Sequence, residues 1–157
     1  MVPGITAASG CGAYAGIPLT HRKDAHAVTF VTAHLGSGPE TDAETEPQPD
    51  WQSLAALGQT LVVYMAGRRV ADISAALLRH GRPAKTPAAV VMAGTTEEQR
   101  CVTGTLGDIA GQVSAAGVTS PAILYVGEVV ALRSRLDWFR PTAPGPAYNE
   151  QHSGAHR

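Results

Sequence analysis

The sequence predicts an α/β fold in which helices flank a mixed sheet of about five strands. Short apolar runs rich in β-branched residues, typical of buried strands, alternate with segments whose apolar residues recur at helical spacing. Glycine and proline separate most of these segments. With 157 residues, 44% of them apolar, the chain has the size of one domain and can bury a core.

A strand, a glycine turn and a helix form the central unit, between Thr60 and Arg79. Leu61–Ala66 reads as a buried strand, and Gly67 breaks the run. The residues that follow at i, i+3 and i+7 on one helical face are Val70, Ile73 and Leu77. Ligands in open α/β sheets bind beyond the carboxyl ends of strands, where Met65 lies. The alternative for Met65 is a methionine that fills a gap in the core.

The first segment predicts a helix over Ala7–Ala15, with Thr6 in the N-cap position and Gly16 to Pro18 at its end. Such a small alanine- and glycine-rich helix needs a neighbour to cover it. We expect Cys11 to be a core residue of this helix.

A strand is expected next, over Ala27–Thr32, and then a long acidic loop. Residues 37–50 carry five acids and no base, and we expect a flexible loop over 37–49. Asp50 reads as the N-cap of a short helix through Ala56.

The second half continues the alternation of strands and helices. Its expected elements are strands over 87–94, 100–106 and 122–130, a helix over 107–116 with Ile109, Val113 and Ala116 on one side, and a helical turn within 132–139. Residues 140–157 contain little that is apolar, so a disordered tail is expected there.

Charge and composition argue against several classes of function. The net charge of −1 gives no field for nucleic acid. Outside the acidic loop basic residues outnumber acidic ones, which suits an anionic small ligand, but on charge alone ordinary surface scatter is the favoured explanation. No apolar run is long enough to span a membrane, and the N-terminus lacks a basic signal-peptide region. Two cysteines favour a reducing compartment, so we expect a cytoplasmic protein. The histidine spacing predicts no metal site.

A ligand site is expected where strands end and the first helix begins. Met65 and Gly94 each close an apolar strand, and Thr6 and Ala7 open a helix. Backbone donors at such places suit a neutral or zwitterionic ligand. The run from Gly10 to Gly16 departs from a dinucleotide-binding fingerprint, because its last glycine comes one residue late and no strand precedes it.

Several segments resemble the tetrapyrrole methylases, in particular the uroporphyrinogen-III C-methyltransferase branch. They cover roughly residues 2–139 in order. The most specific are Gly16-Ile-Pro-Leu-Thr-His-Arg22 and Gly127-Glu-Val-Val-Ala-Leu-Arg133, and Thr60-Leu-Val-Val-Tyr-Met65, His80-Gly-Arg-Pro-Ala84, Ser120-Pro-Ala122 and Trp138-Phe139 also match.

This resemblance implies methyl transfer from S-adenosylmethionine to two pyrrole carbons of uroporphyrinogen III, giving precorrin-2 for sirohaem or cobalamin. It implies a fold of two α/β domains with the cofactor in the cleft between them, and a homodimer for the full-length family. It assigns cofactor contacts to Thr6, Ala7, Met65 and Gly94. It assigns substrate contacts to Met65 and to Arg22, whose guanidinium matches a carboxylate in charge and shape. No catalytic residue is assigned.

Two departures from the family pattern carry expectations. Ala66 stands where the family usually has glycine, and we expect its Cβ to crowd the turn modestly. The glycine-rich loops of the family's first domain are absent. Residues 1–24 are therefore expected to be the end of a truncated first domain and its link, residues 25–139 the C-terminal domain, and the whole a fragment that binds the cofactor weakly and is inactive alone.

Two other functions stay open. The chain is alternatively a non-catalytic binding or assembly module, which pairs with a separately encoded first half, or another member of the methylase superfamily. A substrate test, tetrapyrrole against RNA or a diphthamide precursor, separates the second of these from the main hypothesis.

Overall fold

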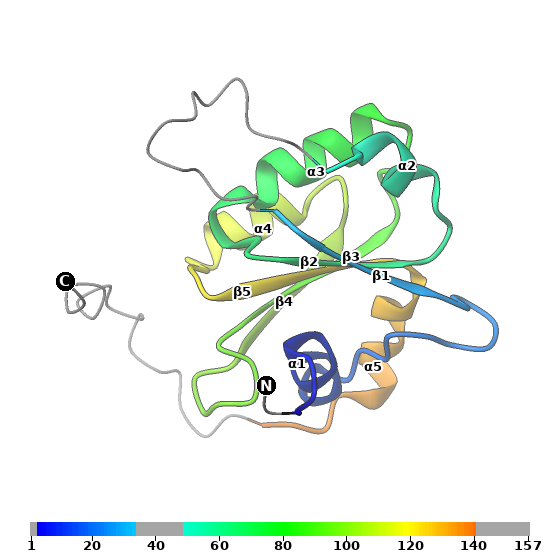
Figure 1. The fold of residues 1–157 in the computed structure, drawn as a ribbon. Coiled ribbons are helices and arrows are strands. Elements are labelled where there is room, and N and C mark those ends of the chain that lie inside the picture. The colour runs from blue at the N-terminus through cyan, green and yellow to red at the C-terminus, as the bar shows by residue number, and fades with distance from the viewer. Residues whose placement is uncertain (1–2, 34–48, 141–157) are drawn as a thin grey trace.

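A computed structural model describes residues 3–33 and 49–140 (Figure 1). Its strands are β1 (Val28–Thr32), β2 (Thr60–Tyr64), β3 (Pro87–Met92), β4 (Arg100–Thr105) and β5 (Ala122–Val126). Its α-helices are α1 (Ala7–Ala15), α2 (Trp51–Ala56), α3 (Val70–Arg79), α4 (Ile109–Ala115) and α5 (Arg133–Leu136). Two 3₁₀ segments, η1 (Gly67–Arg69) and η2 (Glu128–Leu132), precede α3 and α5.

The five strands form one mixed sheet in the order β1-β2-β5-β3-β4. β1 and β2 are parallel, whereas β5 is antiparallel to both of its neighbours, and β4 is antiparallel to β3. Because β5 lies between them, β2 and β3 run in the same direction. Their carboxyl ends therefore meet the amino end of β5 at one edge of the sheet.

Helices cover both faces of the sheet, which makes three layers (Figure 1). On one face α2, α3 and α4 pack over a core that includes Leu61, Val63, Ile73, Leu77 and Ile109. On the other face α1 packs with Ala8, Cys11 and Ala15 against Val91 and Tyr125. The α/β fold with a five-stranded mixed sheet is thus confirmed.

The local predictions hold where periodicity is clear. Val70, Ile73 and Leu77 are all buried, as the helical spacing predicts. Asp50 caps α2, because its Oδ1 accepts a hydrogen bond from the Ser53 N–H at 3.0 Å. The predicted strand over 122–130 is too long: β5 ends at Val126, and Gly127, with φ of 146°, turns the chain into η2.

Three smaller expectations fail or lie largely outside the described residues. Ala116 is exposed, since α4 ends at Ala115 before its apolar face reaches that residue. The acidic loop over 37–48 and the tail from 141 lie outside the described residues.

Candidate functional site

A cavity of about 530 Å³ opens at the sheet edge where β2 and β3 end and β5 begins. Helix α1 forms one side of it. Ala7, Met65 and Gly94, three of the residues predicted to contact a cofactor, lie in its wall. The other described residues that line it are Cys11, Tyr64, Val91, Ala93, Ser120, Pro121, Ala122 and Ile123. Ala7 and Gly94, which are 87 positions apart in the sequence, therefore line the same cavity.

Met65 lies on the rim of this cavity in an unusual backbone conformation. Its φ is 55°, and its side chain is 60% exposed, so it is not a methionine that fills a gap in the core. Ala93 and Thr95, after β3, also have positive φ, at 47° and 71°. Left-handed conformations are costly for residues with a Cβ and collect at ligand sites. The ends of β2 and β3 both show this feature.

Gly94 allows α1 to approach the end of β3 closely. A Cβ atom on Gly94 would overlap the Sγ of Cys11 and stand 3.3 Å from the Cys11 Cα. Cys11 is buried, as predicted, and it also lines the cavity. Burial raises the pKa of its thiol, so the thiol is neutral at neutral pH.

Thr6 stands beside the cavity, and Tyr64 connects it to the cavity wall. Thr6 occupies the N-cap position of α1 as predicted, yet its side chain makes no capping hydrogen bond. Its Oγ1 is hydrogen bonded to the Tyr64 hydroxyl instead. The same hydroxyl accepts a hydrogen bond from the Ala8 N–H at 3.1 Å, so Tyr64 supplies the acceptor that a capping side chain usually provides.

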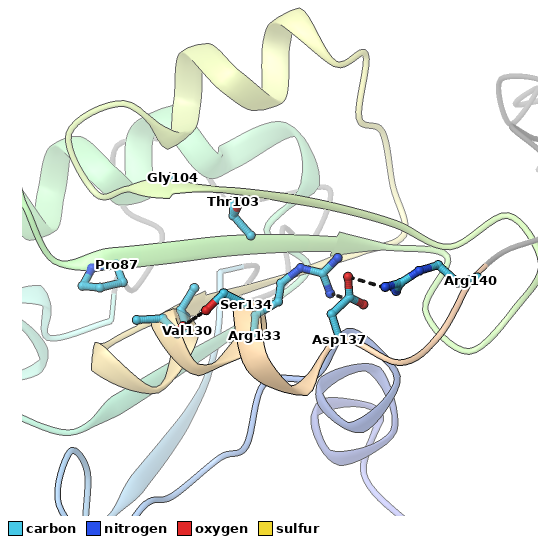
Figure 2. A pocket seen from close by; sticks show the side chains of 9 residues that line it. Pro87, Thr103, Gly104, Val130, Arg133, Ser134, Asp137 and Arg140 are labelled. Atoms are coloured by element: carbon cyan, nitrogen blue, oxygen red, sulfur yellow. Dashed lines mark hydrogen bonds and ion pairs between the residues drawn. The ribbon is translucent and has the colours of Figure 1, made fainter.

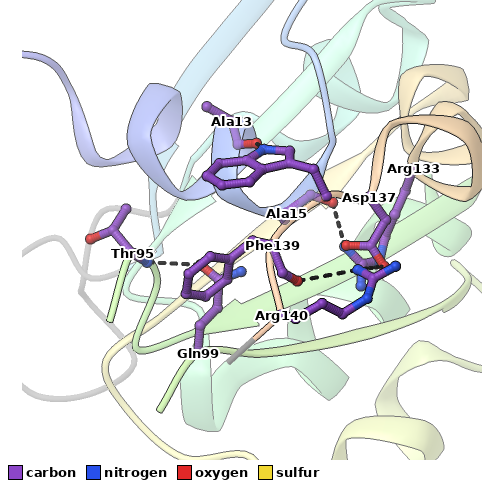
Figure 3. Close-up of polar contacts among 9 residues, drawn as sticks. Ala13, Ala15, Thr95, Gln99, Arg133, Asp137, Phe139 and Arg140 are labelled. Carbon is purple, nitrogen blue, oxygen red and sulfur yellow. Dashed lines mark hydrogen bonds and ion pairs between the residues drawn. The ribbon is translucent and has the colours of Figure 1, made fainter. Parts of the chain in front are cut away.

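The other end of α1 is held by the segment that follows η2 (Figure 3). Arg133 donates a hydrogen bond to the Ala15 carbonyl and pairs with Asp137 at 3.1 Å. The Trp138 Nε1–H donates to the Ala13 carbonyl at 3.0 Å. The Arg133 cation and the Trp138 indole N–H thus satisfy two carbonyls at the negative end of the helix dipole. Helix α1 is consequently fixed at both ends by residues distant in sequence.

The cavity suits a neutral or weakly polar part of a ligand. None of the described residues in its wall carries a charge, and most of the wall is apolar. Its volume lies within the roughly 300–1,000 Å³ that small-molecule sites occupy. Within residues 3–33 and 49–140, no group of three or more His, Cys, Asp or Glu side chains is placed to hold a metal ion. Ring packing and backbone hydrogen bonds are the interactions that this wall offers.

The backbone of Ala66 does not require the glycine that the family usually has there. Its φ and ψ are −74° and −21°, in the right-handed helical region that any residue adopts. The side chain is completely buried in the core under α3. The position that requires an unusual backbone is Met65, one residue earlier.

Two predicted site residues are outside the cavity wall: Thr6, which is hydrogen bonded to Tyr64 of the wall, and Arg22. Arg22 lies in the turn between α1 and β1, which the bridge between His21 and Ala25 closes. Its side chain is exposed, and its carbonyl is hydrogen bonded to the His26 Nε2 at 2.8 Å. A contact between Arg22 and a ligand in the cavity would need a ligand that extends well beyond it.

Sequence reasoning missed part of the cavity wall. Tyr64 and Cys11 were not predicted to contact a ligand, although Cys11 follows Ala7 by four residues and so shares its helix face. The segment Ser120–Ala122 was noticed only for its resemblance. It reaches the cavity because β5 begins between the ends of β2 and β3, and sequence spacing does not reveal that placement.

A second cavity, of about 460 Å³, lies beside β4 and α5 (Figure 2). Asp137 forms ion pairs there with Arg133, at 3.1 Å, and with Arg140, at 3.2 Å. Ser134 donates to the Ala131 carbonyl at 3.1 Å. None of the predicted site residues lines this cavity, and its charged groups are paired with one another.

The first 110 residues match the family model described as tetrapyrrole (corrin/porphyrin) methylases. The chain is 49% identical over 140 residues to a siroheme synthase of Methylococcus capsulatus, and 52% identical over 139 residues to one of Stutzerimonas stutzeri. These matches cover 89% and 88% of the chain, but only 28% of each relative.

Solved structures show the same fold. A uroporphyrin-III C-methyltransferase of Thermus thermophilus in complex with S-adenosylhomocysteine is 34% identical, with a TM-score of 0.66, over 84% of this chain and 53% of that one. A cobalt-precorrin-4 methyltransferase, 21% identical with a TM-score of 0.69, shares the fold. The chain therefore spans about half the length of these solved proteins. No helix in the described part of the chain is long and apolar enough to cross a membrane.

Proposed function

The chain belongs to the tetrapyrrole (corrin/porphyrin) methylase family, and we propose that it forms the C-terminal half of a uroporphyrinogen-III C-methyltransferase. In this proposal its cavity is one wall of the S-adenosylmethionine site, in the synthesis of precorrin-2 for sirohaem or cobalamin. The observation that carries the proposal is the meeting of Ala7, Met65 and Gly94 in one cavity, next to Thr6. The Thermus relative that holds S-adenosylhomocysteine supports the choice of cofactor.

The residues present suit that cofactor. The uncharged, mostly apolar wall suits a flat ring, and Gly94 is part of that wall. The Met65 thioether, 60% exposed, packs against ring or sulfur atoms. When bound, S-adenosylmethionine supplies an electrophilic methyl group on a sulfonium. This chain's contribution is then to hold and orient the ligand on one side, as part of a reaction that depends mainly on alignment.

The substrate assignment rests on chemistry that lies outside the cavity. Uroporphyrinogen III carries several carboxylates, and we assign Arg22 to one of them, because a guanidinium binds a carboxylate through two parallel hydrogen bonds. Its exposure leaves the side chain accessible to a large ligand. The opposite wall of the site is assigned to the part of the longer methyltransferases that this chain does not match. Residues 25–139 are then the C-terminal domain. Homodimer formation and a cytoplasmic location remain predictions.

Calorimetry with S-adenosylhomocysteine on the complete 157-residue chain tests the cofactor site. We expect weak, saturable binding, and Met65→Ala should lower the affinity about tenfold because the thioether packing is lost. The variant should still fold, since an exposed Met65 contributes little to folding. Leu136→Ala is the matched control, because Leu136 is another half-exposed apolar residue and lies outside the cavity. Equal affinities for the two variants, or a folded chain without saturable binding, would contradict the proposal.

An activity assay tests the assignment as one half of a site. The chain alone is expected to form negligible precorrin-2, because the residues of one wall cannot enclose the reacting atoms. Addition of the N-terminal half of a related methyltransferase, expressed separately, is expected to restore methylation of uroporphyrinogen III. Arg22→Met should then raise KM for the substrate with little change in S-adenosylhomocysteine affinity. Vigorous turnover by the isolated chain would refute this part.

A further inference from the structure

We propose that Tyr64 is a positioning residue, which orients the Thr6 hydroxyl and sets the distance between α1 and the Met65 turn. This inference rests on the proposed cofactor site and adds a residue to which no role was assigned. It starts from the hydrogen bonds at the N-terminus of α1, where the Tyr64 hydroxyl takes the place of the capping side chain. The Thr6 side chain does not cap its own helix, and the Tyr64 hydroxyl bonds both to Thr6 Oγ1 and to the Ala8 N–H.

The chemistry of the three groups fixes the direction of one of the two hydrogen bonds. The Ala8 N–H can only donate, so the Tyr64 oxygen accepts there, at 3.1 Å. In the proposed arrangement the phenol O–H donates to Thr6 Oγ1, which is one of the two directions that this pair allows. This arrangement keeps the Thr6 hydroxyl hydrogen available for an acceptor outside the chain. Without the Tyr64 hydroxyl, Thr6 would return to the N-cap hydrogen bond that threonine usually makes in that position.

Tyr64 also connects two walls of the cavity through its backbone. It is the last residue of β2, and Met65, with φ of 55°, follows it directly. Its ring meets Phe30 edge to face, with centroids 6.3 Å apart, which fixes the ring plane. One residue therefore holds the start of α1 through its hydroxyl and the Met65 turn through its main chain.

Tyr125 also supports α1 through its hydroxyl, so it serves as the comparison for a purely structural role. Its hydroxyl donates to the Ala8 carbonyl at 2.8 Å, so it anchors the same turn of α1. Tyr125 is fully buried, however, and has no hydrogen bond to Thr6 among those seen in the described residues. Loss of its hydroxyl should weaken folding without redirecting the Thr6 side chain.

The test is a double-mutant cycle on the complete chain, with S-adenosylhomocysteine as the probe. Tyr64→Phe is expected to weaken binding about five- to tenfold, the worth of one hydrogen bond, while Tyr125→Phe lowers the melting temperature and changes affinity less than twofold. If Tyr64 acts through Thr6, Tyr64→Phe should cost nothing further in a Thr6→Val background. Additive losses, or an unchanged affinity in Tyr64→Phe, would overturn the inference.

A second measurement keeps this inference separate from the proposed function. In a Thr6→Val background, where residue 6 cannot supply a replacement acceptor, hydrogen exchange at the Ala8 amide should accelerate about tenfold on Tyr64→Phe, because that N–H loses its acceptor. If the wild-type chain fails to bind S-adenosylhomocysteine, the proposed function is refuted. The exchange rate of the Ala8 amide still tests whether Tyr64 holds the start of α1. An unchanged Ala8 exchange rate would show that Tyr64 does not hold the helix.

Discussion

Gly94, after β3, packs so closely against Cys11 of α1 that a Cβ atom on Gly94 would stand 2.9 Å from the Cys11 Cβ. This contact joins the helix to the end of the strand at the floor of the candidate cofactor cavity.

Gly94→Ala should therefore destabilise the protein by about 1–3 kcal/mol through overpacking, because the backbone of α1 would have to move. Chemical denaturation measures the change. Cys11→Ala removes the sulfur but keeps a Cβ, so in that background the cost of Gly94→Ala should shrink without vanishing. An equal cost in both backgrounds would show that the two residues do not press on each other.

Arg133→Met should lower the unfolding free energy by about 1–2 kcal/mol. The methionine keeps the apolar stem but loses both the hydrogen bond to the Ala15 carbonyl and the positive charge at the C-terminus of α1. Arg135→Met is the control, since Arg135 lies in the same short helix, α5, and is exposed. That control should change stability by less than about 0.5 kcal/mol. Similar effects of the two variants would contradict the role of Arg133 at α1.

Arg82→Met should be more destabilising, by about 2–3 kcal/mol. The Arg82 side chain is only 8% exposed and donates hydrogen bonds to the Leu57 and Gln59 carbonyls, which would lose their partners. Burial also lowers the pKa of its guanidinium. Arg22→Met, at an exposed site, should leave the denaturation midpoint unchanged. A small effect at Arg82 would mean that water replaces the guanidinium.

Ala66→Gly should destabilise the protein by about 1 kcal/mol. Ala66 has a right-handed backbone and a fully buried methyl group, so glycine would add unfolded-state entropy and leave a small void. Denaturation of this single variant decides between this expectation and the crowding that the family pattern implies. A gain in stability would mean that the methyl group is strained.

The stability of the protein should fall as pH rises from about 9 to 11. Burial raises the pKa of the Cys101 thiol from 9.0 to about 11. In that window the folded state keeps a proton that the unfolded state has released, so folding loses free energy with each step in pH. Cys101→Ala should show a shallower decline than the wild type in denaturation series across this range. Parallel curves would exclude Cys101 as a cause.

Local pattern was enough for the elements of this fold. The spacing of Val70, Ile73 and Leu77 predicted the buried face of α3, and the Asp50 cap predicted the start of α2. Pattern failed at Val126: apolar residues resume after Gly127 and Glu128, but the backbone has already turned at Gly127. Periodicity shows which residues are apolar, but it does not show where the backbone changes direction between two apolar segments.

Pattern and resemblance pointed to different site residues. Met65 and Gly94 are strand-end residues that the pattern alone made candidates, whereas Arg22 came only from the resemblance and lies apart from the cavity wall. Neither source indicated Tyr64. The role proposed for Tyr64 depends on the hydrogen bond between its hydroxyl, at the end of β2, and Thr6, the N-cap residue of α1, which lies 58 residues earlier.

By itself, the sequence determined the kinds of element, their order and the apolar face of each, because these follow from side-chain periodicity and local caps. Tertiary structure alone decided that β5 lies between β2 and β3 and that α1 is held at both ends by distant residues. Those contacts depend on long-range packing, which local propensity does not encode. They are also what brings Ala7, Met65 and Gly94 around one cavity.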